Sequence, residues 1–366
     1  MGNVAGIEVG LPSSIDEVDA GWLTTVLRTS GAIGDASAVT SVASEPFAVG
    51  AGLLSLLFRV TLGYHGDPGP ATLIVKFPIA DAHQRGIADS LNFYPREIRF
   101  YREIASRSKV RTPVVHAAMM AADSTDFVVV MEELVSEQPA DQRDGATWSQ
   151  VLASIDAMAA LHAAWHESSE LDQLSDTFLP LTHPVYSQGL PQIFRHGWPA
   201  TLQHASYLLG PELIDFGNRY CDLLGRMIDT VSTPRTLIHG DWRLDNLFFD
   251  GEGLRVIDFQ LCGLGSGAYD LAYFVSQSVT PELRRGREDE MVDRYLAALA
   301  EHGVVRDRAE LVHQFKVAIA MCFIYGVSSF PSYDDLPERS QVMMRLFPDR
   351  AGQATVDLDA LAELRD

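Results

Sequence analysis

Cysteine and basic residues are both scarce in this chain. Its 366 residues include three cysteines, which form no C-x-x-C pair, so neither a disulfide scaffold nor a zinc ribbon is predicted. Lysine and arginine number 28 against 49 aspartates and glutamates, which gives a net charge of −21 at pH 7. Nucleic acids and anionic membranes bind basic surfaces, so we expect neither as a partner.

Targeting signals and membrane spans are also missing from the sequence pattern. The N-terminus has no basic segment followed by an apolar core, so no signal peptide is predicted. The longest apolar run, residues 317–330, is interrupted by glycine and serine and is shorter than the ~20 residues that a membrane span needs. We interpret it as a buried helix and expect a cytoplasmic protein with reduced thiols.

The chain is long enough for more than one domain of about 150 residues. A capping-box pattern at Ser14 and Glu17 predicts a helix over residues 14–30. Strand patterns follow, and then mainly helical patterns with a loop-rich stretch at 171–198. The predicted class is α+β. The expected parts are a helical extension (1–37), a small antiparallel-sheet lobe (38–131) and a large, mainly helical lobe (132–366).

Two apolar, strand-like runs, residues 236–239 and 254–257, each lead to an aspartate. Asp241 follows the first run, Asp258 closes the second, and Asn246 lies between them. On adjacent strand ends, two carboxylates and an amide form an oxygen-rich site of the kind that Mg²⁺ prefers. We therefore predict a phosphoryl-transfer centre, in which Asp241 orients or deprotonates an acceptor hydroxyl and the other two bind Mg²⁺. Each aspartate taken alone is more often a turn residue.

A lysine interrupts the apolar run 73–77. Burying an ammonium group is costly unless it is paired, so we interpret Lys76 as a lysine that binds the α/β-phosphates of ATP and is held by a carboxylate. That carboxylate should come from the helix predicted at 93–106, where Glu97 and Glu103 are the candidates. An edge-strand lysine that reaches water is the alternative.

Gly50, Gly52 and Ser55 lie in a bend between two predicted strands. Glycine lets the backbone approach a ligand closely, and backbone N–H groups in such a bend can surround phosphate oxygens. The bend is only a fragment of a glycine-rich phosphate loop, so ordinary hairpin glycines are the alternative. His162 and His166 lie four residues apart on a predicted helix, but no H-E-x-x-H pattern accompanies them, so we interpret them as structural or exposed.

The pattern H-G-D-x-x-x-x-N followed by I-D-F resembles the aminoglycoside phosphotransferase and choline kinase-like superfamily, a branch of the protein-kinase-like fold. Its residues here are His239, Gly240, Asp241 and Asn246, then Ile257, Asp258 and Phe259. The segments G-x-G-x-x-D-L-A at 265–272 and L-H-x-x-W at 161–165 resemble the same superfamily, so the likeness covers roughly residues 40–275. Gln260 stands where protein kinases have the D-F-G glycine, which is more similar to the ecdysteroid-kinase-like and related bacterial branches.

The resemblance implies a two-lobed protein-kinase-like fold with its catalytic loop at 237–273. It implies an ATP-dependent small-molecule kinase in which Lys76 pairs with Glu97, while His239 and Asp270 hold the loop. It also implies that backbone groups of the linker between the lobes bind adenine. The linker residues are Met131, Glu132, Glu133 and Leu134.

The expected acceptor is a hydroxylated small molecule, such as an aminoglycoside, a sterol, a macrolide or another polyketide. Aromatic residues of the 170–200 region and near Tyr325 suggest a partly apolar acceptor, and the alternative is that they belong to the core. These are Phe178, Tyr186, Phe194, Trp198, Phe323 and Tyr325. Two other classes stay open, a catalytically silent nucleotide- or metabolite-binding protein and a metal-dependent phosphohydrolase. The oligomeric state and the choice between ATP and GTP also stay open.

Overall fold

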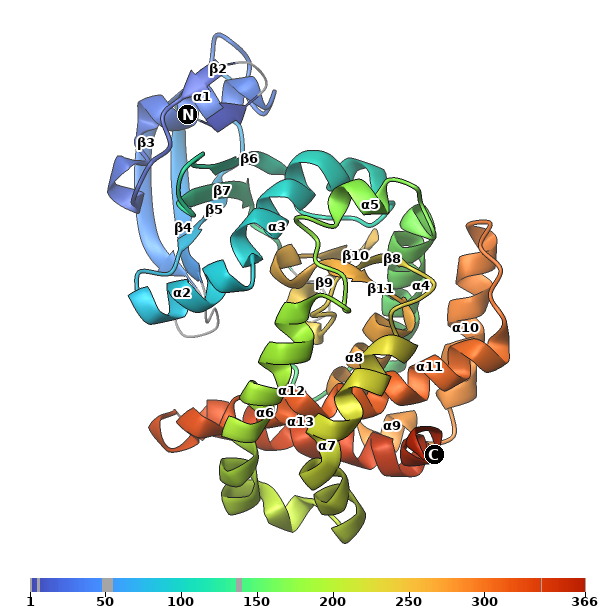
Figure 1. The fold of residues 1–366 in the computed structure, drawn as a ribbon. Coiled ribbons are helices and arrows are strands. Elements are labelled where there is room, and N and C mark those ends of the chain that lie inside the picture. Colours follow the sequence, from blue (N-terminus) through green and yellow to red (C-terminus); the bar gives the residue numbers. More distant parts are fainter. Residues whose placement is uncertain (1, 5–6, 48–54, 136–139, 337, 366) are drawn as a thin grey trace. The chain divides into compact units, whose positions relative to one another are not determined.

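The computed structural model describes residues 2–4, 7–47, 55–135, 140–336 and 338–365 (Figure 1). The chain divides into two compact units. The first comprises Met1–Arg107 and Thr112–Val135, and the second comprises Ser108–Arg111 and Ser136–Asp366. A five-stranded antiparallel sheet dominates the first unit, and the second is mainly helical. The predicted α+β class is confirmed.

The sheet of the first unit has the strand order β3-β4-β5-β7-β6, with antiparallel pairing throughout. Its strands are β3 (Ala38–Phe47), β4 (Ser55–His65), β5 (Thr72–Pro78), β6 (Val115–Met120) and β7 (Phe127–Glu132). Strand β5 is paired on both sides, so its backbone is rigidly placed at the middle of the sheet.

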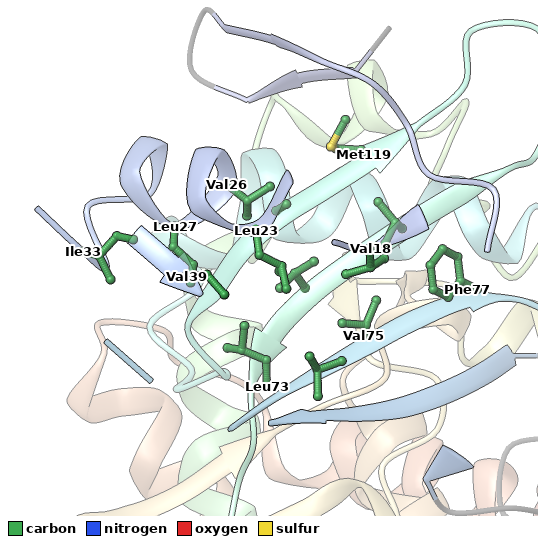
Figure 2. Packing of buried hydrophobic residues seen from close by; sticks show 14 residues of the cluster. Val18, Leu23, Val26, Leu27, Ile33, Val39, Leu73, Val75, Phe77 and Met119 are labelled. Atoms are coloured by element: carbon green, nitrogen blue, oxygen red, sulfur yellow. The ribbon is translucent and has the colours of Figure 1, made fainter. Parts of the chain in front are cut away.

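One face of this sheet carries the core of the first unit. Leu73, Val75 and Phe77 alternate along β5 and pack with the buried face of α1 (Ala20–Thr29), as Figure 2 shows. Successive side chains of a strand point to opposite faces, so Lys76 belongs to the other face of the sheet. The alternation of side chains along β5 therefore places the core on one face of the sheet and Lys76 on the other.

The N-terminal region differs in detail from its prediction. Helix α1 begins at Ala20 rather than near Ser14, because the Asp19 side chain caps it by accepting the Trp22 N–H at 2.8 Å. Ser14 instead precedes a single 3₁₀ turn, Ile15–Glu17. Two short strands, β1 (Gly2–Val4) and β2 (Ile7–Val9), also belong to this region. All of it lies within the first compact unit, where α1 contributes to the core.

The second unit combines many helices with two short antiparallel sheets. Its helices are α4 (Trp148–Trp165), α5 (Leu171–Leu174), α6 (Pro184–Ala205), α7 (Pro211–Thr230), α8 (Ala268–Ser278), α9 (Pro281–Arg284), α10 (Glu288–Glu301), α11 (Arg308–Met321), α12 (Phe323–Val327) and α13 (Glu338–Asp357). Its sheets pair β8 (Thr236–Ile238) with β11 (Gly263–Gly265), and β9 (Leu247–Asp250) with β10 (Gly253–Val256). Helix α11 starts the stretch Arg308–Asp335, which is long and apolar enough to cross a membrane. However, 72% of its most apolar 18-residue segment is buried inside the protein, as expected for the buried helix that the sequence predicts.

The stretch predicted to be loop-rich is largely helical. Helix α6 contains Pro191 and Pro199, and each proline removes only one backbone donor from a long helix. The opposing stabilisation comes from packing, because the ring of Phe194 stacks on Tyr220 of α7 with centroids 4.1 Å apart. Trp198 adds an edge contact to Phe323 at 6.0 Å. Tertiary packing therefore outweighs the local preference of proline.

Candidate active site

Lys76 and Glu97 form a buried ion pair inside the first unit. Glu97 reaches the lysine from α3 (Phe93–Arg99), on the sheet face that α1 does not cover. The Lys76 Nζ lies 2.8 Å from Glu97 Oε1 and 2.8 Å from Oε2, and the side chains are 8% and 1% exposed. Glu103, the other candidate, pairs instead with Arg99 at the surface. The carboxylate that pairs with Lys76 is therefore Glu97.

The predicted phosphate-binding bend is described only in part. Ser55 is the first residue of β4 and is buried. Its partner in β5 is Pro78, so it lies on the strand next to the one that carries Lys76. Gly50 and Gly52 lie outside the described residues. The role of the three residues in phosphate binding stays a prediction.

The predicted linker begins inside the sheet. Met131 and Glu132 are the last residues of β7 and pair with Ile74 and Leu73 of β5. The Glu132 side chain accepts the Val114 N–H at 2.7 Å. The following residue, Glu133, binds Arg59 at 2.6 Å, and this hydrogen bond lowers the pKa of the Glu133 carboxyl. Leu134 follows and is half-buried. Because both glutamate side chains are engaged, adenine binding here would depend on backbone groups.

Asp241 follows β8 in the second unit, and its carboxylate has hydrogen-bond donors from three residues. The Tyr273 hydroxyl donates to Oδ1 at 2.6 Å, and Asn246 Nδ2 donates to Oδ2 at 3.0 Å. Arg243 Nε lies 3.2 Å from Oδ1 and 3.3 Å from Oδ2. The Asp241 side chain is 13% exposed, so these donors and their surroundings cover most of the carboxylate. A fixed orientation of this kind suits a residue that must align a reacting hydroxyl.

Arg243 is a site residue that the sequence analysis missed. Its Nη1 also binds Asp245 Oδ2 at 3.0 Å, so it joins two carboxylates of the loop. The negative charge of Asp241, with smaller effects from Tyr273, Asp245 and Asp258, raises the pKa of the guanidinium above its already high value. Its position between Asp241 and Asp245, two residues from each, was the available signal in the sequence. Arg243 compensates carboxylate charge in the loop.

Asn246 connects the two halves of the predicted metal site. It is buried, and its Nδ2 donates to the Asp241 backbone oxygen at 2.9 Å as well as to the carboxylate. Its backbone oxygen accepts the Ile257 N–H at 3.1 Å, which brings the residue before Asp258 against Asn246. With Nδ2 committed to Asp241, Oδ1 is the Asn246 atom that can ligate a metal.

Asp258 does not lie on a strand adjacent to β8, contrary to the expectation. Strand β8 pairs with β11 and β10 pairs with β9, and Asp258 comes two residues after β10 ends at Val256. The contacts of Ile257 with Asn246 and His239, rather than a shared sheet, bring the two segments together. The backbone of Asp258 is left-handed, with φ 67° and ψ 64°. Strained backbone of this kind is common at functional sites.

The donor set of Asn246 and Asp258 fits Mg²⁺. A carboxylate and an amide carbonyl are hard oxygen ligands, and Mg²⁺ commonly uses one or two carboxylates together with phosphate oxygens and waters. Within the described ranges, no group of three or more His, Cys, Asp or Glu side chains could hold a metal.

Asp270 fixes the backbone that leads into Asp241. Its Oδ2 accepts the His239 N–H at 2.6 Å, and its Oδ1 accepts the Gly240 N–H at 2.9 Å. His162 binds Asp270 Oδ2 at 3.0 Å through Nε2 and Tyr295 at 2.8 Å through Nδ1, which confirms its structural interpretation. Gly240 has φ 81°, and a Cβ there would collide with a backbone oxygen, so only glycine fits.

Three tyrosines, Tyr269, Tyr273 and Tyr325, form a cluster beside Asp241. Tyr269 and Tyr273 lie one turn apart on α8, and Tyr325 belongs to α12. The Tyr269 and Tyr325 hydroxyls are hydrogen-bonded to each other, and the Tyr273 and Tyr325 ring centroids lie 4.6 Å apart. The spacing of four residues between two tyrosines was the only sequence signal for this cluster. We call these residues the tyrosine cluster.

Most of the aromatic residues proposed to contact an acceptor belong to the core instead. The structure buries Phe178, Phe194, Trp198 and Phe323. The rings of Phe194, Trp198 and Phe323 are covered because α6, α7 and α12 pack together around them. Tyr186 and Tyr325 keep partial exposure. The acceptor-facing aromatic surface suggested by sequence is therefore smaller than expected.

A further support of the loop comes from α13. Arg350 is buried, and its Nη1 donates to the backbone oxygens of Gln142 at 2.6 Å and of Gln277 at 2.9 Å. The Gln142 side chain in turn accepts the Leu244 N–H at 3.0 Å. Leu244 lies between Asp241 and Asn246, so Arg350 supports the loop through one intermediate residue.

Comparison with solved structures shows the same fold. An aminopropanol kinase associated with a microcompartment is 16% identical, with a TM-score of 0.54 over 89% of this chain and 94% of that chain. The choline kinase of Cryptosporidium parvum is 11% identical, with a TM-score of 0.52 over 94% and 95%. A spectinomycin phosphotransferase, solved with ADP and spectinomycin, is 11% identical, with a TM-score of 0.51 over 94% and 99%. The two-lobed kinase-like α+β fold is thereby confirmed.

Comparison of sequences identifies the family. No curated protein sequence matches the chain. The model of the ecdysteroid kinase-like family matches residues 49–304, which is more than half of the chain and includes both the Lys76–Glu97 pair and the Asp241 loop. The resemblance drawn from the H-G-D-x-x-x-x-N and I-D-F motifs is confirmed by this match. The chain belongs to the ecdysteroid kinase-like family.

Proposed function

We propose that the protein is a small-molecule kinase that transfers the γ-phosphate of ATP to a hydroxyl group of a low-molecular-weight acceptor. The observation that carries the proposal is the constrained Asp241 carboxylate, bonded to Asn246, whose backbone in turn bonds the residue before Asp258. These bonds support the proposal because they join Asp241 to Asn246 directly and join Asn246 to the residue before Asp258.

The reaction needs an aligned hydroxyl more than it needs covalent chemistry. Asp241 accepts a hydrogen bond from the acceptor hydroxyl and directs its oxygen toward the γ-phosphorus. The new bond joins that oxygen to phosphorus, and the bond from phosphorus to the β,γ-bridging oxygen breaks. ADP leaves, and the acceptor proton passes to Asp241 and then to solvent.

Asn246 Oδ1 and the Asp258 carboxylate would hold Mg²⁺, which when bound would neutralise phosphate charge. Arg243 keeps the neighbouring carboxylates compensated, since it binds Asp241 and Asp245. Asp270 keeps the Asp241 backbone in place through the two N–H groups that precede it.

Nucleotide binding is proposed for the first unit. Lys76 would bind the α/β-phosphate oxygens, with Glu97 fixing its ammonium group. Gly50, Gly52 and Ser55 would contribute backbone and hydroxyl donors to the phosphates. Backbone groups at Met131–Leu134 would bind the adenine edge.

The acceptor is proposed as a small hydroxylated molecule. Proteins of the same fold are named for aminopropanol, choline and spectinomycin, which all carry hydroxyl groups. The net charge of −21 is compatible with a cationic acceptor, and the partly exposed Tyr186 and Tyr325 are compatible with an acceptor that has an apolar face. The proposed location is the cytoplasm, where ATP is available.

The test is an ADP-release assay with Mg·ATP and a panel of amino alcohols, aminoglycosides, sterols and macrolides, coupled to mass detection of the phosphorylated acceptor. Asp241→Asn should lower turnover by roughly 10²–10⁴-fold, because it removes the base without changing size. Its Mg·ATP affinity should stay close to that of the parent. The matched control is Asp222→Asn, the same chemical change on the exposed surface of α7.

Three outcomes would contradict the proposal. Near-normal turnover by Asp241→Asn would remove the assigned base. Mg·ATP binding without ADP release for any acceptor would indicate a nucleotide-binding protein. ADP release into water, with no acceptor phosphorylated, would indicate a phosphohydrolase.

A further inference from the structure

Tyr273 contacts the proposed base directly, although it lies 32 residues further along the chain. Its hydroxyl donates to Asp241 Oδ1 at 2.6 Å, and Asn246 donates to the opposite oxygen at 3.0 Å. Arg243 Nε lies at similar distances from both oxygens, so it does not select between rotations of the carboxylate. The hydroxyl of Tyr273 and the amide of Asn246 are therefore the two donors that fix this rotation.

We propose that Tyr273 is a positioning residue for phosphoryl transfer, whose hydroxyl sets the rotation of the Asp241 carboxylate toward the acceptor. This inference rests on the proposed function. A carboxylate rotates about its Cβ–Cγ bond, and that torsion is broad and soft. A donor on each oxygen restricts it, so the remaining lone pairs point in fixed directions.

The tyrosine can act only as a donor in this contact. Burial raises the pKa of the Tyr273 phenol well above its usual range, and the charge of Asp241 raises it further. The phenol therefore stays protonated at physiological pH. Its interaction with Asp241 is a charge-assisted hydrogen bond, which is stronger than one between neutral groups.

The rest of the tyrosine cluster keeps the Tyr273 ring in place. Tyr325 packs against that ring at an interplanar angle of 64°, and Tyr269 bonds the Tyr325 hydroxyl. Tyr273 and Tyr269 share helix α8 with Asp270, which holds the His239 and Gly240 N–H groups. One helix thus positions both the backbone and the side chain of the Asp241 segment.

The test compares Tyr273→Phe with the parent protein in steady-state kinetics. The change removes one oxygen and keeps the ring, so packing in the cluster is preserved. We expect kcat to fall by about 10- to 100-fold, because misorientation of a catalytic group has costs of this order. The KM for ATP should change by less than about twofold. The matched control is Tyr220→Phe, which removes a buried hydroxyl bonded to the Met321 backbone oxygen and should leave kcat unchanged.

A double-mutant cycle separates positioning from a purely structural role. If Tyr273 acts through Asp241, adding Tyr273→Phe to Asp241→Asn should cause less than about a twofold further loss. A purely structural effect would multiply the two losses. A fall in kcat of similar size for Tyr220→Phe would likewise overturn the proposal.

The failure of this inference is distinguishable from the failure of the proposed function. A parent protein that turns over ATP with an acceptor, together with a Tyr273→Phe variant of equal kcat, would overturn the positioning role alone. A parent protein without phosphoryl transfer to any acceptor would overturn both. A crystal structure of Tyr273→Phe gives a readout without activity, and an unchanged Asp241 carboxylate rotation there would count against the proposal.

Discussion

The His239 ring joins the chain segment of Asp241 to that of Asp258 by binding the Ile257 backbone oxygen at 3.0 Å. The Asp241 N–H donates to the Nδ1 of the same ring at 3.2 Å, so Nδ1 is an acceptor and the ring hydrogen lies on Nε2. The His239 imidazole therefore links the segment that carries Asp241 to the segment that carries Asp258.

Asp258→Asn should weaken the metal dependence of nucleotide binding. Asparagine keeps the size and tolerates the left-handed backbone of Asp258, whereas alanine would add strain. It loses the negative charge that Mg²⁺ prefers. We expect the Mg²⁺ concentration for half-maximal activity to rise by more than about tenfold, measured by titrating activity with Mg²⁺. ATP affinity measured without a divalent metal should match the parent, and an unchanged Mg²⁺ titration would contradict the ligand role.

The Lys76–Glu97 pair should affect both stability and nucleotide affinity, and a double variant can separate the two. Lys76→Met alone leaves the Glu97 charge buried, which typically costs 3–5 kcal/mol, so we expect the first unit to lose about that much. Lys76→Met with Glu97→Gln should recover most of the stability but not the affinity for ATP. Hydrogen exchange of the sheet amides measures the stability of the first unit, and equilibrium binding measures the affinity for ATP.

The exposed pair Arg99–Glu103 is the matched control for that experiment. It lies close to Glu97 in the chain, and its side chains are 24% and 55% exposed. Arg99→Met with Glu103→Gln should change stability by less than about 1 kcal/mol, because exposed pairs contribute little. Recovery of ATP affinity in the Lys76→Met, Glu97→Gln variant would contradict the phosphate-binding role of Lys76.

The sequence predicted those site residues whose positions follow from local patterns. The apolar run around Lys76 indicated a buried lysine that needs a carboxylate partner, and the fixed spacing from Asp241 to Asn246 indicated that these two residues are neighbours. Arg243 was overlooked although its partners Asp241 and Asp245 each lie only two residues away in the sequence. Tyr273 escaped prediction because its contact with Asp241 depends on how separate segments converge. The pattern of a single helix or loop does not encode such a convergence.

The fold, like the site, was predictable where local sequence patterns determine it. The sheet and most helices followed from apolar periodicity, but the first part of α6 was missed because Pro180, Pro184 and Pro191 indicated a loop over residues 171–198. The packing of Phe194 on Tyr220, which offsets those prolines, joins residues on two different helices. The pairing of β8 with β11 rather than next to β10 also depends on chain topology. Local propensity was outweighed by tertiary contact in each case.

Arg350→Met should destabilise the second unit and lower kcat. The variant would leave the carbonyl oxygens of Gln142, Arg143 and Gln277 without their guanidinium donor. An unsatisfied buried acceptor costs about 1–3 kcal/mol, so we expect a loss of several kcal/mol in unfolding free energy. The measurement is chemical unfolding of the full chain, combined with kcat under conditions where the variant is folded.

The matched control for Arg350 is Arg345→Met on the same helix. Arg345 is half-buried and binds the Tyr333 hydroxyl, away from Gln142. Arg345→Met should lower the free energy of unfolding less than Arg350→Met does, and it should leave kcat close to the parent value. Because Arg350 lies beyond residues 49–304, a kcat effect would show that a segment outside the family match supports the Asp241 loop. An Arg350→Met variant that folds and keeps its kcat would contradict this coupling.

The first unit should lose stability in mild acid because of His116. Its Nδ1 lies 3.2 Å from Ser30 Oγ, while its Nε2 is buried with no hydrogen-bond partner among the described residues. Burial lowers the pKa of this imidazole below its ordinary value of 6.5, and nearby Glu132 opposes the shift only in part. In the folded state His116 therefore binds fewer protons near pH 6 than in the unfolded state.

The sign of the effect follows from proton linkage. A folded-state pKa below the unfolded value gives a stability contribution that is fully present above about pH 6.5 and is lost as the pH falls through the folded-state pKa. His116→Gln removes this titration, so the difference in opening free energy between parent and variant should shrink as the pH falls from about 7.5 to 5.5. Hydrogen exchange of the β6 and β7 amides, corrected for intrinsic exchange, measures that difference. The control Ser30→Ala keeps the imidazole and should retain the pH dependence of the parent. A His116→Gln variant with the same pH slope as the parent would show that another group causes the pH dependence.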